Sequence, residues 1–214
     1  MTKLICMIGP INGGKDFRAN QFKSDSRVFG YSMEHINFAD ELREMMWDLL
    51  DWRPKNNKEY EEFKTGTMMM HEMSIVTNYQ TDIDITGREL LQNLGTEVMR
   101  KRVPNFWSDM WRGKVEKALD EGKNVVCSDL RFINEYKTAL GVSTGKDKNP
   151  PKKEFIYCCY KPEERNLDAK HSSEVLACEL YKAGCRDGDI IPFDLIENII
   201  SRVEKGIREL EKGE

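Results

Sequence analysis

The segment Gly9–Asp16 has the residue types and the spacing, G-x-x-x-x-G-K, of a phosphate-binding loop. Glycines in such a loop let the backbone turn tightly and bring its N–H groups up to phosphate oxygens, and the lysine reaches the outer phosphates. The helix that follows points its positive end at the same anion. A glycine-rich turn with a solvated lysine is the alternative. We expect the phosphates of a nucleotide to be bound by Gly9, Asn12, Gly13, Gly14, Lys15 and Asp16.

An acidic residue stands at the end of a second apolar run, Val125–Asp129. Ligands of a parallel sheet bind at the carboxyl ends of its strands, so Asp129 is placed to act on Mg²⁺ or on its waters. Arg131 follows two residues later and would stabilise the charge of a phosphoryl group. A structural contact between Asp129 and Arg131 is the alternative interpretation.

The predicted phosphate loop lacks the hydroxyl that normally helps to hold Mg²⁺. The residue after Lys15 is Asp16 in place of serine or threonine, and Phe17 follows it. We therefore expect Asp16 and Asp129 to bind the metal, directly or through water.

Arg43 is a further candidate, in the first turn of a helix that we predict to begin with Asp40 as its N-cap. The helix dipole disfavours a cation at that end, which indicates an anion ligand. A surface arginine paired with Glu41 or Glu44 explains the position equally well.

The elements that must position these residues alternate between strand-like and helix-like patterns. Apolar runs at Leu4–Ile8, Val125–Asp129 and Phe155–Tyr160 predict buried strands, and segments between them carry helical spacing. This alternation predicts an α/β fold with a parallel sheet and helices on both faces.

A helix is predicted after Thr86, which forms a capping-box pattern with Glu89. Gly95 inside this helix costs about 1 kcal/mol against alanine, so it indicates close approach of a ligand or backbone, or a contact between helices. Another helix follows Pro104, and Trp107 at its start can pack in the core or meet a base.

Two segments fit the alternation less well. Residues 51–85 are the least regular part, which suggests a lobe inserted over a substrate, and we place this lobe at about 51–104. Cations after the last apolar run indicate a lid at about 161–175 that closes over phosphates, with an exposed charged loop as the alternative. The 214 residues otherwise form one domain.

The composition excludes several classes of function. The net charge of −4 argues against a nucleic-acid or membrane surface of one sign, and no apolar run is long enough to span a membrane. The N-terminus does not read as a signal peptide. Six cysteines without a C-x-x-C pair fit buried thiols in a reducing compartment, so we expect a cytoplasmic protein.

Several segments together resemble the deoxynucleoside monophosphate kinases of bacteriophages, a branch of the P-loop nucleoside monophosphate kinases. They occur in the family's order and span most of the chain. The family commonly has a threonine after G-K-D, where this chain has Phe17, and residues 51–85 match poorly. The matching stretches are Gly9–Asp16, Phe38–Arg43, Arg88–Glu97, Trp107, Ser128–Arg131, Asn134–Glu135, His171–Glu174 and Arg186–Asp189.

The resemblance implies a P-loop kinase-type sheet flanked by helices, with an inserted monophosphate-binding lobe and a lid. It implies transfer of the γ-phosphoryl group of ATP, with Mg²⁺, to a deoxynucleoside monophosphate (dNMP), which gives the diphosphate and ADP. Lys161, Arg165 and His171–Glu174 would belong to the lid, and a homodimer is compatible with this reading. The expected catalytic residues are Lys15, Asp129, Arg131 and Arg165. The expected acceptor-binding residues are Arg43, Arg88, Gln92, Gly95, Thr96, Trp107, Asp129, Arg131 and Glu135.

Two other functions stay open. One is a different small-molecule kinase on the same scaffold, such as a phosphomevalonate kinase-like enzyme, which would not need to stack a base. The other is a nucleotide-binding module without turnover, which the missing loop hydroxyl at Asp16 favours.

Overall fold

A computed structural model describes residues 2–28, 30, 32–73, 80–144, 151–164, 167, 169 and 171–213. The chain folds into two compact units. Unit 1 comprises Met1–Phe38 and Ser108–Glu214, and unit 2 comprises Ala39–Trp107. The lobe expected at about 51–104 falls within unit 2.

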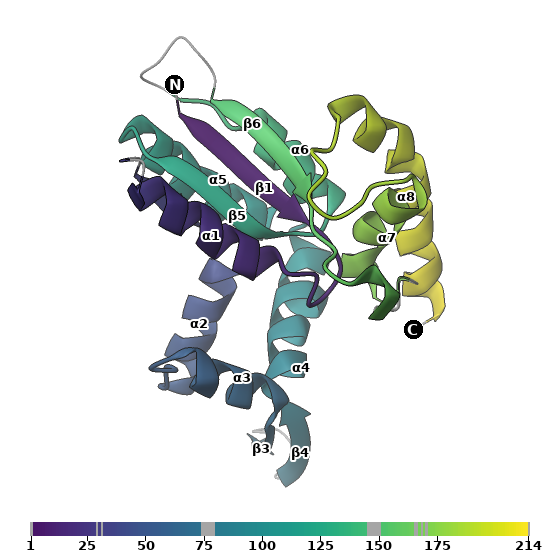
Figure 1. Cartoon of the computed structure of the whole chain (residues 1–214). Helices are drawn as coiled ribbons and strands as arrows, with labels where there is room; N and C mark the ends of the chain where they lie inside the picture. Colours follow the sequence, from purple (N-terminus) through teal and green to yellow (C-terminus); the bar gives the residue numbers. More distant parts are fainter. Residues whose placement is uncertain are drawn as a thin grey trace. The chain divides into compact units, whose positions relative to one another are not determined.

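Unit 1 is built on a four-stranded sheet in which all the pairs are parallel (Figure 1). The central strand β1 pairs with β5 on one side and with β6 on the other, so its carboxyl end is enclosed between two strands. The predicted α/β class with a parallel sheet is therefore confirmed. In spatial order the strands are β2 (Met33–His35), β5 (Asn124–Leu130), β1 (Lys3–Ile8) and β6 (Lys152–Tyr157).

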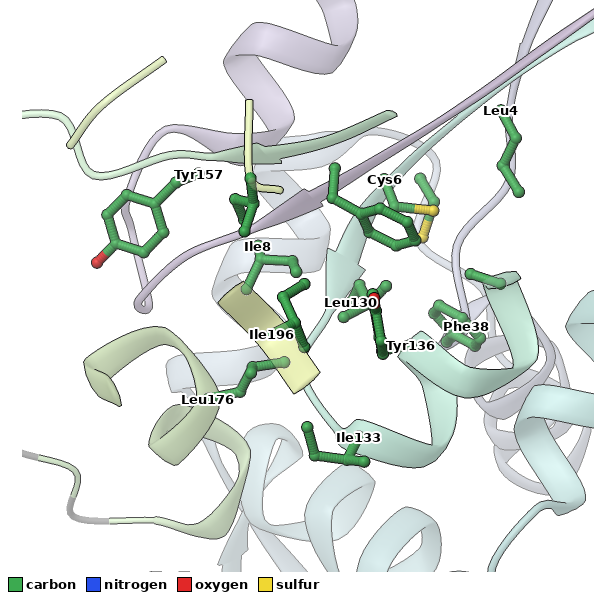
Figure 2. Packing of buried hydrophobic residues seen from close by; sticks show 14 of the residues in the cluster. Leu4, Cys6, Ile8, Phe38, Leu130, Ile133, Tyr136, Tyr157, Leu176 and Ile196 are labelled. Carbon is green, nitrogen blue, oxygen red and sulfur yellow. The ribbon is translucent and has the colours of Figure 1, made fainter. Parts of the chain in front are cut away.

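Alternate side chains of the strands pack on opposite faces of this sheet, as the period of two requires. Ile5 and Met7 of β1 pack with Ala19 of α1 (Lys15–Val28) on one face. Leu4 and Cys6 face the larger core on the other side (Figure 2). Helices thus lie on both faces. Those that contribute to the larger core are α5 (Phe106–Asp120), α6 (Ile133–Gly141), α7 (Val175–Lys182) and α8 (Phe193–Gly213).

Unit 2 has regular elements where the sequence indicated little regularity. Its small core consists of Met46, Trp47 and Phe63, with partly buried leucines around them. The strands β3 and β4 pair antiparallel over their whole length, from Thr67 opposite Thr86 to Met73 opposite Gln80. The elements are α2 (Asp40–Leu50), α3 (Asn57–Thr65), β3 (Thr67–Met73), β4 (Gln80–Thr86), α4 (Gly87–Gln92) and the π-helix η1 (Asn93–Arg100).

The cysteines agree with the expectation of unpaired thiols. All six are free and buried. Among the helices that the structure describes, none combines the length and the apolarity needed to cross a membrane.

Candidate functional site

The predicted phosphate loop follows β1 and is packed against the chain that leaves β6. A Cβ atom on Gly9 would stand 1.9 Å from the carbonyl oxygen of Cys158, and one on Gly13 would stand 2.6 Å from the same oxygen. Both contacts are to backbone, which cannot turn away. The two glycines are therefore required by close approach of a neighbouring strand end, in addition to any ligand.

The loop closes on itself before it enters α1. The N–H of Gly13 donates to the carbonyl oxygen of Pro10 at 3.0 Å, and Asn12 and Gly14 adopt positive φ angles of 57° and 86°. The N–H of Arg18 donates to the carbonyl oxygen of Gly14 in the first helical turn. The amides at the very start of a helix have no carbonyl behind them, so this end of α1 offers donors to an anion.

Lys15 is buried, with 6% of its surface exposed. Its Nζ donates to the carbonyl oxygens of Gly9 at 2.8 Å and Pro10 at 2.6 Å. Burial, and after it the positive charge of Arg131, lowers the pKa of Lys15 to about 8, while Asp16 and Asp129 act in the opposite direction. The fold thus gathers Lys15, Asp16, Asp129 and Arg131, four residues chosen from the sequence, at the carboxyl ends of β1 and β5.

Asp16 is bound to a hydroxyl that the sequence did not single out. The Oγ of Ser128 on β5 donates to Oδ1 of Asp16 at 2.5 Å. His35 Nε2 lies 2.8 Å from the same Oγ, and Oδ1 of Asn37 accepts the backbone N–H of Ser128 at 2.8 Å. The end of β2 and the residues after it therefore hold the end of β5, directly beside the start of α1.

Asp129, the residue after Ser128, also bonds to the segment that follows β2. Its Oδ1 accepts the N–H of Phe38 at 2.9 Å and lies 3.3 Å from the Sγ of Cys127. These contacts fix the direction of the carboxylate and make part of its role structural. Asp129 remains in the candidate site through its effect on Lys15.

Glu135 serves the helix that it belongs to. It is buried, and its Oε2 accepts the backbone N–H groups of Arg131 at 2.8 Å and of Phe132 at 3.1 Å. These bonds cap the start of α6 and set the direction in which the chain leaves β5. The acceptor role implied for Glu135 by the resemblance stays a prediction, and its Oε2 is already occupied by two donors.

The turn at Arg186–Asp189 is tied to the same end of the sheet. Asp187 accepts from the Arg18 guanidinium at 2.7 Å and from the N–H of Cys159 at 2.9 Å. The turn thus joins α1 to the chain that leaves β6.

Arg43, in unit 2, is paired within its own helix. Its Nη2 donates to Asp40 Oδ1 at 2.5 Å, and its guanidinium carbon stands 5.8 Å from the centre of the Tyr60 ring. Asp40, which the sequence did not suggest as a partner, therefore pairs with Arg43, and Glu44 pairs with Arg53 at 2.7 Å. The prediction that Asp40 caps the helix was wrong, because Ala39 is the cap residue and makes no side-chain bond, while the Asp40 carboxylate turns to Arg43.

Gly95 is explained by packing inside unit 2. A Cβ atom there would stand 2.6 Å from the Leu42 side chain, and the Gly95 carbonyl oxygen accepts from Trp107 Nε1 at 3.0 Å. The contact between helices, one of the alternatives that the sequence left open, is present. Trp107 itself is 3% exposed, so neither ring face is open to a base in this conformation.

Three further acceptor-binding residues implied by the resemblance also lie in unit 2. Arg88 and Gln92 are on α4, and Thr96 is on η1. Arg88 and Thr96 are half-buried, and Gln92 is exposed. The capping box that begins α4 is confirmed, since Thr86 and Glu89 exchange side-chain to backbone bonds in both directions.

The lid region is described only in part. Arg165 lies outside the described residues. Lys161 is exposed and has a positive φ angle of 52°, and His171 Nδ1 accepts the N–H of Ser173 at the start of a short 3₁₀ turn.

A magnesium ion would find hard oxygen donors here but no complete protein cage. Within the part of the chain that the structure describes, no three His, Cys, Asp or Glu side chains are grouped to hold a metal ion alone. Mg²⁺ commonly takes one or two carboxylates and completes its shell with waters and substrate phosphates. The Asp16 carboxylate, exposed at the end of the loop, fits that requirement.

Sequence reasoning missed Ser128, His35 and Asn37. Ser128 lies within one of the stretches that carry the resemblance, but no pattern in the sequence assigned a role to it. One signal could have found Ser128. The phosphate loop lacks its usual hydroxyl, and Ser128 supplies a hydroxyl at the end of a strand, one residue before Asp129.

No protein-family model matches the chain, and no curated protein or solved structure gives a match.

Proposed function

We propose that this chain is an ATP-dependent phosphotransferase whose acceptor is a deoxynucleoside monophosphate. The observation that carries the proposal is the buried Lys15 at the junction of the loop and α1. A lysine and the start of a helix at one glycine-rich loop favour a polyphosphate ligand. Asp16, Asp129 and Arg131 surround this lysine with the charges that phosphoryl transfer uses.

The work of the residues would be positioning and charge stabilisation. Lys15 would exchange its two carbonyl acceptors for oxygens of the outer phosphates. Arg131 would stabilise the charge spread over the transferring group, and Arg165 is assigned the same role from the resemblance. Mg²⁺, when bound, neutralises phosphate charge. An acceptor phosphate is anionic near neutral pH, so no residue of the chain has to act as a general base.

Most of the residues to which this proposal gives an acceptor-binding role lie in unit 2, and Asp129, Arg131 and Glu135 lie in unit 1. Arg43 and Arg88 supply cations for a monophosphate, and Gln92 and Thr96 supply polar groups. Base stacking by Trp107 would require the ring to leave its present place, because the ring is buried and its N–H is bonded to Gly95. A Trp107→Ala variant would disturb packing and cannot by itself distinguish a nucleotide acceptor from another acceptor.

The test is ADP release with ATP and Mg²⁺ across a panel of acceptors. The panel contains the deoxynucleoside monophosphates, their ribose counterparts and phosphomevalonate. Turnover with one or more deoxynucleotides supports the proposal and reports the accepted bases. Turnover with phosphomevalonate alone assigns the chain to the alternative small-molecule kinase.

The burial of Trp107 is the observation in favour of the alternative small-molecule kinase, because a non-nucleotide acceptor needs no stacking ring. A module without turnover would bind ATP and release no ADP with any acceptor of the panel.

A further inference from the structure

Asp16 occupies the position at which a phosphate loop normally carries its metal-holding hydroxyl. Its carboxylate does not stand alone on the helix. Oδ1 accepts the hydroxyl of Ser128, which is 112 residues away in the chain, at 2.5 Å. A bond of that length to a charged acceptor is a strong one.

The hydrogens of this cluster can be assigned. Two acceptors face the one hydrogen of the Ser128 hydroxyl, Oδ1 of Asp16 at 2.5 Å and Oδ1 of Asn37 at 3.2 Å, and the shorter distance favours Asp16. His35 Nε2, 2.8 Å from the same oxygen, must then be the donor to Ser128. The backbone N–H of Ser128 is held by Asn37 Oδ1 at 2.8 Å. The hydroxyl is therefore fixed in position and in direction.

The support for Ser128 comes from strands. His35 belongs to β2 and is in register with Val126 of β5, and the N–H of Ile36 donates to the carbonyl oxygen of Val126 at 3.0 Å. The Trp111 indole donates to the Ile36 carbonyl at 3.0 Å. A group held by paired strands and a core helix keeps its place better than one held by a loop.

Ser128 and Asp16 differ in exposure. Ser128 is 1% exposed, whereas Asp16 is exposed. The hydroxyl is therefore beneath the carboxylate, and the carboxylate is the group that a ligand can reach. Asp129, the acid expected on the strand, has its Oδ1 bonded to the Phe38 N–H.

We propose that Ser128, held by His35 and Asn37, positions the Asp16 carboxylate for the magnesium ion of the bound nucleotide. The usual arrangement has the hydroxyl on the loop and the acid on the strand. In this chain the loop carries an acid, Asp16, and the strand carries a hydroxyl, Ser128, directly before the strand acid Asp129. The inference rests on the proposed function for its ligand, but it concerns binding and does not require turnover.

The experiment compares the affinity for a non-hydrolysable ATP analogue with Mg²⁺ and with EDTA. The wild type should bind more tightly with Mg²⁺. Ser128→Ala should lose roughly 10- to 100-fold of that enhancement, the usual effect of removing a residue that orients a metal ligand, with its EDTA affinity unchanged. Ser128→Thr should retain the enhancement, because it keeps the hydroxyl. Ser24→Ala, exposed on α1, is the matched control.

A merely structural role for Ser128 would give a different result. It would lower the melting temperature and weaken binding equally with and without Mg²⁺, and that outcome overturns the inference. An unchanged enhancement in Ser128→Ala overturns it as well. If Ser128→Ala does not fold, His35→Phe, which removes the donor to Ser128 from a half-buried site, should reduce the enhancement in the same direction.

The double variant Asp16→Ser with Ser128→Asp puts the hydroxyl on the loop and the carboxylate at position 128. We expect it to recover more Mg²⁺ enhancement than either single variant, and failure to exceed both contradicts a joint role of the two residues. Loss of enhancement in Ser128→Ala in a protein that turns over no acceptor would support the inference and reject the proposed function. Turnover of a deoxynucleotide acceptor, together with an Mg²⁺ enhancement that Ser128→Ala leaves unchanged, would support the proposed function and reject the inference.

Discussion

The ammonium group of Lys15 donates to the carbonyl oxygen of Pro10 at 2.6 Å. It also donates to Gly9, so the lysine satisfies the loop's own carbonyls when no anion is bound. The arrangement keeps a buried cation hydrogen-bonded, but two carbonyl dipoles do not replace a full counter-charge. Burial without a full counter-charge therefore lowers the pKa of Lys15.

Proton uptake on binding is the first consequence. With a pKa of about 8, Lys15 is neutral in about half of the molecules at pH 8. Polyphosphate oxygens favour the charged form, so binding of ATP at pH 8 should take up a fraction of a proton. Calorimetry in two buffers of different ionisation enthalpy measures this number. Proton release at pH 8, or the same uptake in Lys15→Met, would contradict the assignment.

Stability should depend on pH through the same residue. The pKa of Lys15 is about 8 in the fold against its ordinary value of 10.5, so the unfolded chain binds more protons in that window. The contribution of Lys15 to the free energy of unfolding therefore rises between pH 8 and pH 10.5, by about 3 kcal/mol in total. Below pH 8 the full cost of the buried charge is present.

The check is urea denaturation of the wild type and Lys15→Met at several pH values. The advantage of the variant should be largest at pH 7 and shrink toward pH 10. Lys117→Met, exposed on α5, measures the general effect of removing a lysine. If the difference in the free energy of unfolding between Lys15→Met and the wild type does not change with pH, burial does not lower the pKa of Lys15.

Gly9 should tolerate no side chain. Alanine there would place its Cβ 1.9 Å from the Cys158 carbonyl oxygen, so β1 and β6 would have to separate at their carboxyl ends. We expect Gly9→Ala to lower the free energy of unfolding by about 3 kcal/mol or more, at the upper end for an overpacked core.

Gly113→Ala is the matched control, because a Cβ atom on this residue of α5 meets nothing within 4 Å. Alanine is the better helix former, so this variant should gain up to about 1 kcal/mol. Chemical denaturation of both variants gives the comparison. Equal stabilities for Gly9→Ala and the wild type would show that the loop does not pack as described.

Trp107→Phe tests the packing of unit 2. The substitution keeps a large ring but removes the N–H that donates to the Gly95 carbonyl oxygen. The Gly95 carbonyl lies within the helix η1, so the variant removes one hydrogen bond, worth about 0.5–1.5 kcal/mol, without orphaning the acceptor. Trp52→Phe is the control, since Trp52 is 41% exposed. Amide exchange of residues in α4 and η1 measures the local effect, and equal exchange in both variants would contradict the role of Trp107.

Local signals predicted much of this molecule. The loop at Gly9–Asp16, the capping box at Thr86 and the strands around Cys6 and Cys127 each depend on neighbours in sequence, and the structure has them where expected. The hairpin of β3 and β4 was missed although Gln80–Thr86 alternates polar and apolar residues toward its end. The methionine run beside it offers no such alternation, which hid the partner strand.

Long-range pairings were beyond the sequence. Asp16 meets Ser128 only because β5 inserts between β1 and β2 in the sheet, an order that no local pattern specifies. The same holds for Gly95, whose contact with Leu42 joins two helices of unit 2. Arg43 could be recognised as a cation in an unfavourable helical position, but its choice of Asp40 depends on rotamers that spacing does not determine.

The most direct test of the central claim is acceptor-dependent ADP release by the wild type and by Lys15→Ala, with Lys117→Ala as control. We predict turnover with a deoxynucleoside monophosphate in the wild type and the control, and a loss of about 10³-fold in Lys15→Ala with the fold retained. Near-wild-type turnover in Lys15→Ala would contradict the placement of the site at this loop.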